Sequence, residues 1–133
     1  MLEEIIERLE DELDSDDFEY VMEDCMQELD ESGTGIEAVE PLLRLMERHP
    51  LSDFGMPGAI VRYAEQFYGR GYEDILVSSV ERRPTLHTVW MLNRIINAEE
   101  DESEKEKYED VMINILDRTE IEDEIKNSVR ELL

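Results

Sequence analysis

The residues in this chain that could perform chemistry are mostly carboxylates, and the first chemistry that their spacing suggests is metal binding. In the segment DESGTGIEAVEP, Asp30, Ser32 and Thr34 occupy the first, third and fifth positions of a calcium-binding loop. Such a loop also needs a bidentate carboxylate at its twelfth position, where this chain has Pro41. We therefore predict that the segment links two helices and binds no calcium.

Other catalytic or metal-binding patterns are incomplete. The acidic residues in EEIIE, residues 3–7, would need a second acidic pair one helix later to hold a divalent metal, and none follows. His49 and His87 lack the spacing of metal ligands, and the single cysteine, Cys25, lies on an apolar stripe with no cation to activate it. Neither a phosphate-binding glycine loop nor a nucleophile elbow is present. The sequence therefore predicts a protein that is not an enzyme and uses no cofactor or metal.

Acidic residues dominate the chain, with 37 Asp and Glu against 13 Lys and Arg and a formal net charge of −24. Such a charge repels nucleic acids and anionic membranes and attracts basic proteins. Residues 1–50 and 98–133 carry the whole excess of acid, while residues 51–97 are neutral. We therefore predict a basic protein as the partner, and neither nucleic acid nor membrane.

The sequence contains no pattern typical of a membrane span or an export signal. No window approaches the ~20 apolar residues that cross a bilayer, and the first residues are acidic, unlike the basic start of a signal peptide. A single cysteine excludes an internal disulfide and fits a reducing compartment. These features predict a cytoplasmic protein.

Apolar residues recur at intervals of three and four along the chain, a spacing typical of amphipathic helices. No segment alternates as a strand does. The pattern predicts an all-α fold of about eight short helices in a single domain, residues 1–133. Short connections make neighbouring helices antiparallel, so the expected architecture is either a HEAT-like α–α superhelix or a compact helical bundle.

Capping residues, glycines and prolines mark the expected helix boundaries. Pro41 either kinks the third helix or occupies its first turn. Pro57 is predicted to be the first residue of the fourth helix. Helix caps are predicted at Ser15, Thr85, Ser103 and Thr119, the last two as capping boxes with the glutamates three residues later.

One segment, RRPTLHTVWMLNRIIN at residues 82–97, contains no acidic residue and holds the only tryptophan. Its helix is apolar around most of its circumference, which predicts a central helix with Trp90 in the core. Asn93 lies within the apolar arc, so we expect its amide to bond to a neighbouring backbone. The narrow remaining face, with His87, Met91 and Arg94, either pairs with the chain's own acids or contacts a partner, and self-pairing is the favoured interpretation.

Two runs in the centre of the chain, LSDFGMPGAIVRYAEQFYGRGYEDILVSSVERRPT and LHTVWMLNRIIN, resemble small helical immunity proteins of bacterial polymorphic toxin systems. The resemblance covers about residues 50–97, and its main motifs are DFGMPG and PTxHTVWMLNRIIN, in which x is any residue. In such systems a short acidic protein neutralises the toxic domain of a secreted toxin. The resemblance implies a complex with a cognate toxin and assigns no binding residues.

Charge and resemblance together predict a surface that binds a protein. The favoured function is a toxin-neutralising immunity protein that blocks a cognate, basic toxin domain such as a nuclease. The alternative is an acidic helical-repeat adaptor with an endogenous partner. The expected contacts are four acids, Asp14, Asp16, Asp17 and Glu19, and three aromatic residues, Tyr20, Tyr68 and Tyr72.

Overall fold

Eight α-helices follow one another in the computed structural model, which describes all residues 1–133. A short 3₁₀ helix, Ile36–Ala38, precedes the third of them, and another, Ile115–Asp117, follows the seventh. The predicted all-α fold of about eight short helices is confirmed. The helices are α1 (Leu2–Asp11), α2 (Phe18–Glu31), α3 (Val39–Arg48), α4 (Ala59–Glu65), α5 (Tyr72–Arg82), α6 (Leu86–Ala98), α7 (Glu102–Asn114) and α8 (Asp123–Leu132).

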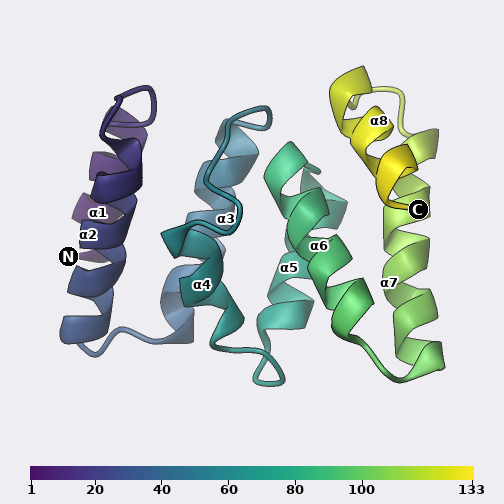
Figure 1. Cartoon of the computed structure of the whole chain (residues 1–133), viewed down its shortest axis with the longest axis horizontal. Helices are drawn as coiled ribbons and strands as arrows, with labels where there is room; N and C mark the ends of the chain where they lie inside the picture. Colours follow the sequence, from purple (N-terminus) through teal and green to yellow (C-terminus); the bar gives the residue numbers. More distant parts are fainter.

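Consecutive helices lie antiparallel in pairs, and the four pairs stand side by side in a row (Figure 1). The odd-numbered helices form one layer, in which α1 packs on α3, α3 on α5 and α5 on α7. In the second layer α2 packs on α4 and α6 on α8. As a result, the connection between α1 and α2 and the connection between α4 and α5 lie at opposite ends of the helices (Figure 1).

One continuous hydrophobic core of 33 buried residues runs through the row, from Ile5 in α1 to Val129 in α8. Burial of this apolar surface is the main favourable contribution to folding. Cys25 is fully buried within the core, and burial raises the pKa of its thiol, as expected of a structural cysteine. None of the helices is both long and apolar enough to cross a lipid bilayer.

Two predicted features of helix starts are confirmed. Thr85 caps α6 through a reciprocal pair of hydrogen bonds: its Oγ1 accepts the Thr88 N–H at 2.9 Å, and Thr88 Oγ1 accepts the Thr85 N–H at 3.1 Å. Pro41 lies in the first turn of α3, where its missing N–H removes no helical hydrogen bond. Of the two alternatives for Pro41, a kink or a place in the first turn of the helix, the structure therefore shows the second.

The predicted starts at Ser15 and Pro57 are wrong by two residues. Ser15 Oγ accepts the N–H of Asp17 at 3.1 Å, which forms a turn ahead of the helix, and α2 itself begins at Phe18. Pro57 follows a cis peptide bond in the turn that precedes α4, and that helix begins at Ala59. In both places a local turn takes the position that the sequence pattern assigns to the helix.

The predicted capping boxes at Ser103 and Thr119 are also wrong. Asp101 caps α7 instead, because its extended backbone lets the carboxylate accept the N–H of Ser103 at 2.9 Å and of Glu104 at 3.3 Å. Helix α8 begins only after Glu122, whose carboxylate accepts a hydrogen bond from Arg83 at 2.7 Å and caps nothing. The carboxylate of Asp101 therefore replaces Ser103 as the cap of α7, and the ion pair with Arg83 keeps Glu122 from capping α8.

We expect Asp101→Ala to lower the free energy of unfolding by about 1 kcal/mol, because two backbone N–H groups of α7 lose their acceptor. Ser103→Ala should change it by less than about 0.5 kcal/mol, since the Ser103 hydroxyl caps no helix. Urea denaturation followed by circular dichroism measures both. Equal effects of the two substitutions would contradict the assignment of the cap to Asp101.

Helix α6 turns a different face to solvent from the predicted one. His87 and Met91, expected on the narrow outer face, are buried. Trp90 and Asn93 are only partly buried, with Trp90 packed at the edge of the core, and the Asn93 amide forms no hydrogen bond. The predicted backbone contact of Asn93 is therefore wrong. Because α6 is apolar nearly all round, the hydrophobic period alone did not define its outer face.

Candidate protein-binding surface

The motif DFGMPG forms a loop, residues 53–58, that is anchored in the core by one aromatic ring. Phe54 is fully buried and meets Phe18 and His87 edge-on, with ring centroids 6.0 Å and 5.6 Å apart. The Asp53 carboxylate accepts the N–H of Gly55 at 2.8 Å, which closes the turn. The loop is thus fixed from below by packing and from within by a hydrogen bond.

Two glycines let this loop fold back on itself. Gly55 has a φ of +88°, a conformation that side chains disfavour. A Cβ on Gly58 would overlap the carbonyl oxygen of Phe54, and a Cβ on Gly55 would lie 2.7 Å from the Cα of Gly58. The backbones therefore pack directly on each other. The result is a tightly shaped loop that holds Met56 65% exposed to solvent.

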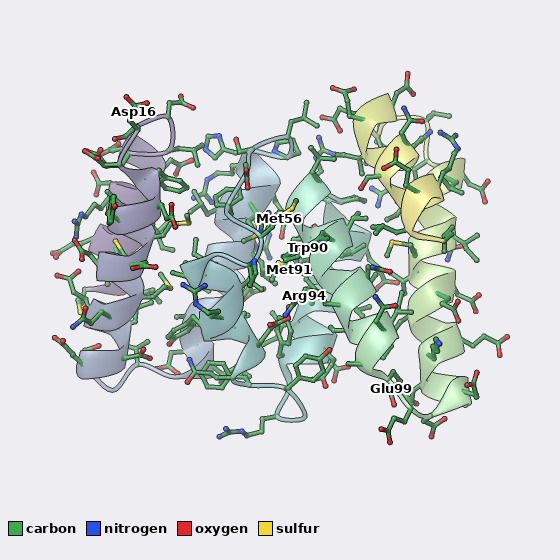
Figure 2. All side chains as sticks on the ribbon, viewed as in Figure 1. Asp16, Met56, Trp90, Met91, Arg94 and Glu99 are labelled. Carbon is green, nitrogen blue, oxygen red and sulfur yellow. The ribbon has the colours of Figure 1, made fainter.

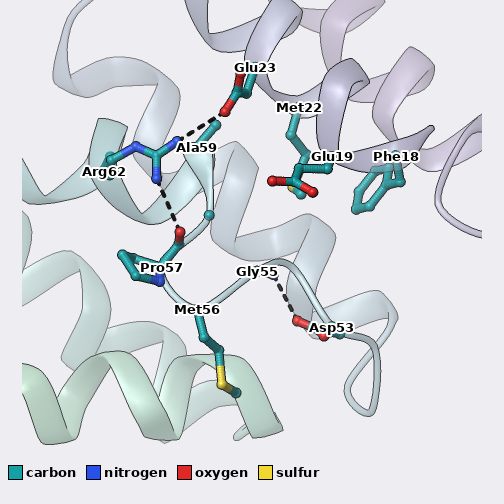
Figure 3. A pocket seen from close by; sticks show the side chains of 11 residues that line it. Phe18, Glu19, Met22, Glu23, Asp53, Gly55, Met56, Pro57, Ala59 and Arg62 are labelled. Carbon is teal, nitrogen blue, oxygen red and sulfur yellow. Dashed lines mark hydrogen bonds and ion pairs between the residues drawn. The ribbon is translucent and has the colours of Figure 1, made fainter. Parts of the chain in front are cut away.

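A groove of about 390 Å³ separates this loop from α2 (Figure 3). The Glu19 carboxylate points into it from α2, while the Met56 side chain extends from the loop away from α2 (Figure 3). The walls combine apolar and acidic side chains. The lining residues are Phe18, Glu19, Met22 and Glu23 of α2, Asp53, Gly55, Met56, Pro57 and Gly58 of the loop, and Ala59 and Arg62 of α4.

Only one cation lies in the groove, Arg62, and both terminal nitrogens of its guanidinium have partners within the chain. Arg62 contacts the Glu23 carboxylate at 3.3 Å and donates to the carbonyl oxygen of Pro57 at 3.1 Å (Figure 3). Glu19, one helical turn before Glu23, forms no ion pair within the chain, and Asp53 bonds only to the loop backbone. With three carboxylates and one guanidinium, the groove keeps an excess of negative charge.

The predicted acidic contacts lie beside this groove. Asp14, Asp16 and Asp17 are exposed in the connection between α1 and α2, with Asp16 at its tip (Figure 2), and none of them forms an ion pair. Glu19 and Tyr20 follow in the first turn of α2, and Tyr20 is 70% exposed. Five of the predicted contact residues therefore share one end of the molecule.

The other two predicted contacts, Tyr68 and Tyr72, lie away from this surface. Tyr68 belongs to the connection between α4 and α5, at the opposite end of the helices (Figure 1), and is 37% exposed. Tyr72 is fully buried, its ring packed edge-on against Tyr68 at 5.8 Å, and burial raises its pKa. The assignment of Tyr72 as a partner contact is therefore wrong, because it opens α5 with its ring turned into the core.

The arginines of the acid-free segment form ion pairs with acidic residues of the same chain, which confirms the favoured prediction of self-pairing. Arg94 contacts Glu65 through two hydrogen bonds of 2.7 Å and 2.9 Å, and its guanidinium lies 5.1 Å from the centre of the Trp90 ring. Arg82 pairs with Glu47 and Arg83 with Glu122, residues from the two acidic flanks. The segment therefore presents no basic surface to a partner.

His87 links the loop to α6. Its ring meets Phe54 on one side and Trp90 on the other, at centroid distances of 5.6 Å and 5.5 Å, and its Nε2 has no hydrogen-bond partner. Burial lowers the pKa of His87 to about 4, and the charge of Asp53 offsets this only in part. The imidazole is therefore neutral at physiological pH and behaves as an aromatic core residue.

We expect His87 to make the fold sensitive to mild acid. Its ordinary pKa is about 6.5, so between pH 6.5 and about 4 the unfolded chain binds a proton that the folded chain refuses. The neutral ring therefore contributes fully to the free energy of unfolding above pH 6.5. This contribution declines as the pH falls, by at most about 1.4 kcal/mol per pH unit. Urea midpoints measured from pH 7.5 to 4.5 check this.

The matched variant is His87→Gln, which cannot titrate in this range. Ion-paired carboxylates such as Glu10 and Glu122, whose pKa values are lowered by Arg48 and Arg83, also lose stabilisation in acid. They do so in both proteins, so the difference in slope between wild type and variant isolates the histidine. Parallel pH profiles for the two proteins would contradict a neutral buried His87.

Compared with models of known protein families, with characterised proteins and with solved structures, the chain matches none. The features that sequence reasoning missed are Met56 and the groove with Arg62, Glu23 and Asp53. The closest signal was the pair of glycines three residues apart in DFGMPG, which indicates a close backbone crossing.

Proposed function

We propose that this protein is an immunity protein, which binds the basic toxic domain of a cognate toxin in the cytoplasm and blocks it in a one-to-one complex. The observation that carries this proposal is the run of exposed carboxylates from Asp14 to Glu19, which form no ion pair and border a groove with a further excess of acid. A protein of opposite charge would be attracted to this end of the molecule.

The basic residues of the chain do not neutralise its acidic surface. Nine of the 13 Lys and Arg residues form ion pairs within the chain, so few remain to offset the 37 acids. The resulting field would steer a basic partner inward and repel nucleic acid. An immunity protein seated on a basic catalytic cleft would thereby exclude a nucleic-acid substrate from it.

Apolar anchors accompany the charge. A tight interface needs well-packed apolar or aromatic residues at its centre, and Tyr and Met are enriched there. Tyr20 on α2 and Met56 on the loop are among the most exposed large apolar side chains of the protein, and Leu51, just before the loop, is 43% exposed. These residues supply the apolar contact that electrostatic attraction alone does not.

The resemblance supports the same function. Its two motifs are separate in the sequence, yet they meet in the fold through the contact between Phe54 and His87. The motif around α6 thus supports the loop from below, and the loop displays Met56. Two motifs that together shape one surface loop would suit a protein that recognises a partner.

A tagged pull-down from the native cell, performed at low and at high salt and analysed by mass spectrometry, tests the proposal. We expect one toxin domain to be retained in equal proportion even at high salt, and to lose its toxicity when both proteins are co-expressed. The combined variant Asp14→Asn, Asp16→Asn, Asp17→Asn and Glu19→Gln should slow association. Its matched control changes four exposed, unpaired acids near the other end of the row, Glu102, Glu106, Asp110 and Asp117.

Two outcomes would contradict the proposal. Retention of an assortment of basic proteins that high salt removes together would show general attraction to charge. Retention of one endogenous, non-toxic partner would favour the acidic adaptor instead. Equal effects of the two four-residue variants on association would remove the α1–α2 end from the interface.

A further inference from the structure

We propose that the groove between α2 and residues 53–58 receives an arginine side chain of the protein partner, at the position of Glu19. This inference rests on the proposed function in one respect, namely that the partner is a basic protein. It adds the place of contact and the residue type that is recognised. Met56, on the outer side of the loop, would pack against the partner beside that arginine.

Arg62 already demonstrates how this groove holds a guanidinium. Its head group bridges the two walls, with the Glu23 carboxylate of α2 at 3.3 Å and the Pro57 carbonyl of the loop at 3.1 Å. Glu19 stands one turn earlier on the same helix and points into the same groove (Figure 3). The groove therefore contains two carboxylates in equivalent positions along α2, and the chain provides a cation for only one of them.

The charge of the groove favours an additional cation with several donors. Glu23 is matched by Arg62, whereas Glu19 and Asp53 form no ion pair, and the Asp53 carboxylate accepts only the Gly55 N–H. Charge-assisted hydrogen bonds to carboxylates are stronger than neutral ones. A guanidinium at Glu19 would gain such bonds and would reduce the excess negative charge that Glu19 and Asp53 leave in the groove.

The apolar part of the lining favours arginine over lysine. Phe18 and Met22 contribute to the floor of the groove next to Glu19. The planar guanidinium is weakly hydrated, stacks on apolar and aromatic surfaces and donates in two directions, whereas an ammonium group is strongly hydrated. A mixed acidic and apolar groove therefore suits arginine. A metal ion fits less well, because the chain contains no group of three His, Cys, Asp or Glu arranged to hold one.

The loop that forms the outer wall is already shaped for binding. Phe54 fixes it in the core, Asp53 closes its turn, and the crossing of Gly55 and Gly58 determines its path. A preorganised wall lowers the entropy lost on association. The partner's arginine would therefore meet a formed groove rather than one that it must create.

The test is an NMR titration of the full chain with three capped tripeptides that differ only at the centre: Gly-Arg-Gly, Gly-Lys-Gly and the uncharged isostere Gly-citrulline-Gly. We expect the arginine peptide to shift the amide signals of residues 18–23 and 53–59 in a saturable manner. The lysine peptide should bind the same residues several-fold more weakly, and the citrulline peptide should not bind. Glu19→Gln should weaken the arginine peptide about tenfold, the effect of losing one charge-assisted hydrogen bond.

Glu106→Gln is the matched control, since Glu106 is an exposed, unpaired glutamate on α7 with the same formal charge. It should leave the groove shifts unchanged. Shifts spread evenly over the acidic surface, equal binding of the arginine and lysine peptides, or equal effects of the two variants would each overturn the inference. A groove that binds arginine while no toxin is captured would leave this inference standing and remove the immunity function, and the reverse result would move the toxin to another surface.

Discussion

Gly58→Ala should lower the free energy of unfolding by about 3 kcal/mol, an effect in the range of overpacked interior positions. The added methyl group would overlap the Phe54 carbonyl oxygen and press on the backbone of Gly55, and neither is a flexible side chain that could move aside. The loop would have to open, which would draw Phe54 out of its contacts with Phe18 and His87. Urea denaturation measures the loss.

Gly35→Ala is the matched control for this prediction. Its new Cβ would meet only the end of the Glu37 side chain, at 3.2 Å, and that carboxylate can rotate away. We expect a change of less than about 1 kcal/mol in either direction. If Gly58→Ala proved as mild as Gly35→Ala, the direct packing of the two loop backbones would be refuted, and with it the fixed outer wall of the groove.

The second large effect concerns Glu47, which joins α3 to α5. Its carboxylate accepts hydrogen bonds from Ser79 at 2.7 Å and from two nitrogens of Arg82 at 2.8 Å and 2.6 Å, and its side chain is only 9% exposed. Glu47→Ala would strip the partners from a buried hydroxyl and a partly buried guanidinium. Because removal of one member of a buried ion pair strands the other, we expect a loss of about 3 kcal/mol.

The exposed pair of Glu40 and Arg44 on α3 provides the comparison. These residues lie 3.4 Å apart, four positions apart on one helix, and about half of each side chain is open to solvent. Glu40→Ala should therefore change the free energy of unfolding by less than about 0.5 kcal/mol. Similar losses in Glu40→Ala and Glu47→Ala, measured by thermal and urea denaturation, would show that the α3–α5 ion pair is no stronger than a surface pair.

The sequence was sufficient to predict the elements of the fold because their apolar residues repeat with the helical period. Cys25 on its stripe, Thr85 before α6 and Pro41 in the first turn of α3 each obey a local rule that the structure keeps. The same kind of rule predicts a cap at Ser103, but Asp101, two residues earlier, caps α7 instead because its carboxylate accepts two N–H groups of that helix. When two possible capping residues lie close together, the spacing of one capping motif does not show which residue caps the helix.

Surface and core were harder to separate in the middle of the chain. Tyr72 and Met91 were placed on surfaces although both are buried, and Asn93 was placed in the core although it is partly exposed. In α6, apolar residues cover most of the circumference, so the period does not single out one face. The acids from Asp14 to Glu19 were predicted to be exposed and are, because carboxylates with no cation nearby cannot be buried without a large desolvation penalty.

The groove lay beyond sequence reasoning for a different reason. Its walls come from α2 and from a loop more than twenty residues further along the chain, and the contact that joins them is the buried ring of Phe54 against Phe18. No local sequence pattern predicts this contact between Phe54 and Phe18. The position of the DFGMPG loop opposite Glu19 depends on the packing of α2 on α4.

The row of helix pairs has a mechanical consequence. Each pair packs mainly on its neighbours, so the first pair is held from one side only, by α3 and α4. In such a quasi-linear assembly, fraying proceeds from the ends inward, and each pair opens with its own free energy. Amide hydrogens of α3, α5 and α6 should exchange last and those of α1 first. Helix α1 and the connection with Asp14, Asp16 and Asp17 would then be able to adjust to a partner's contour, while α2, which packs on α4 and on the ring of Phe54, keeps the groove in shape.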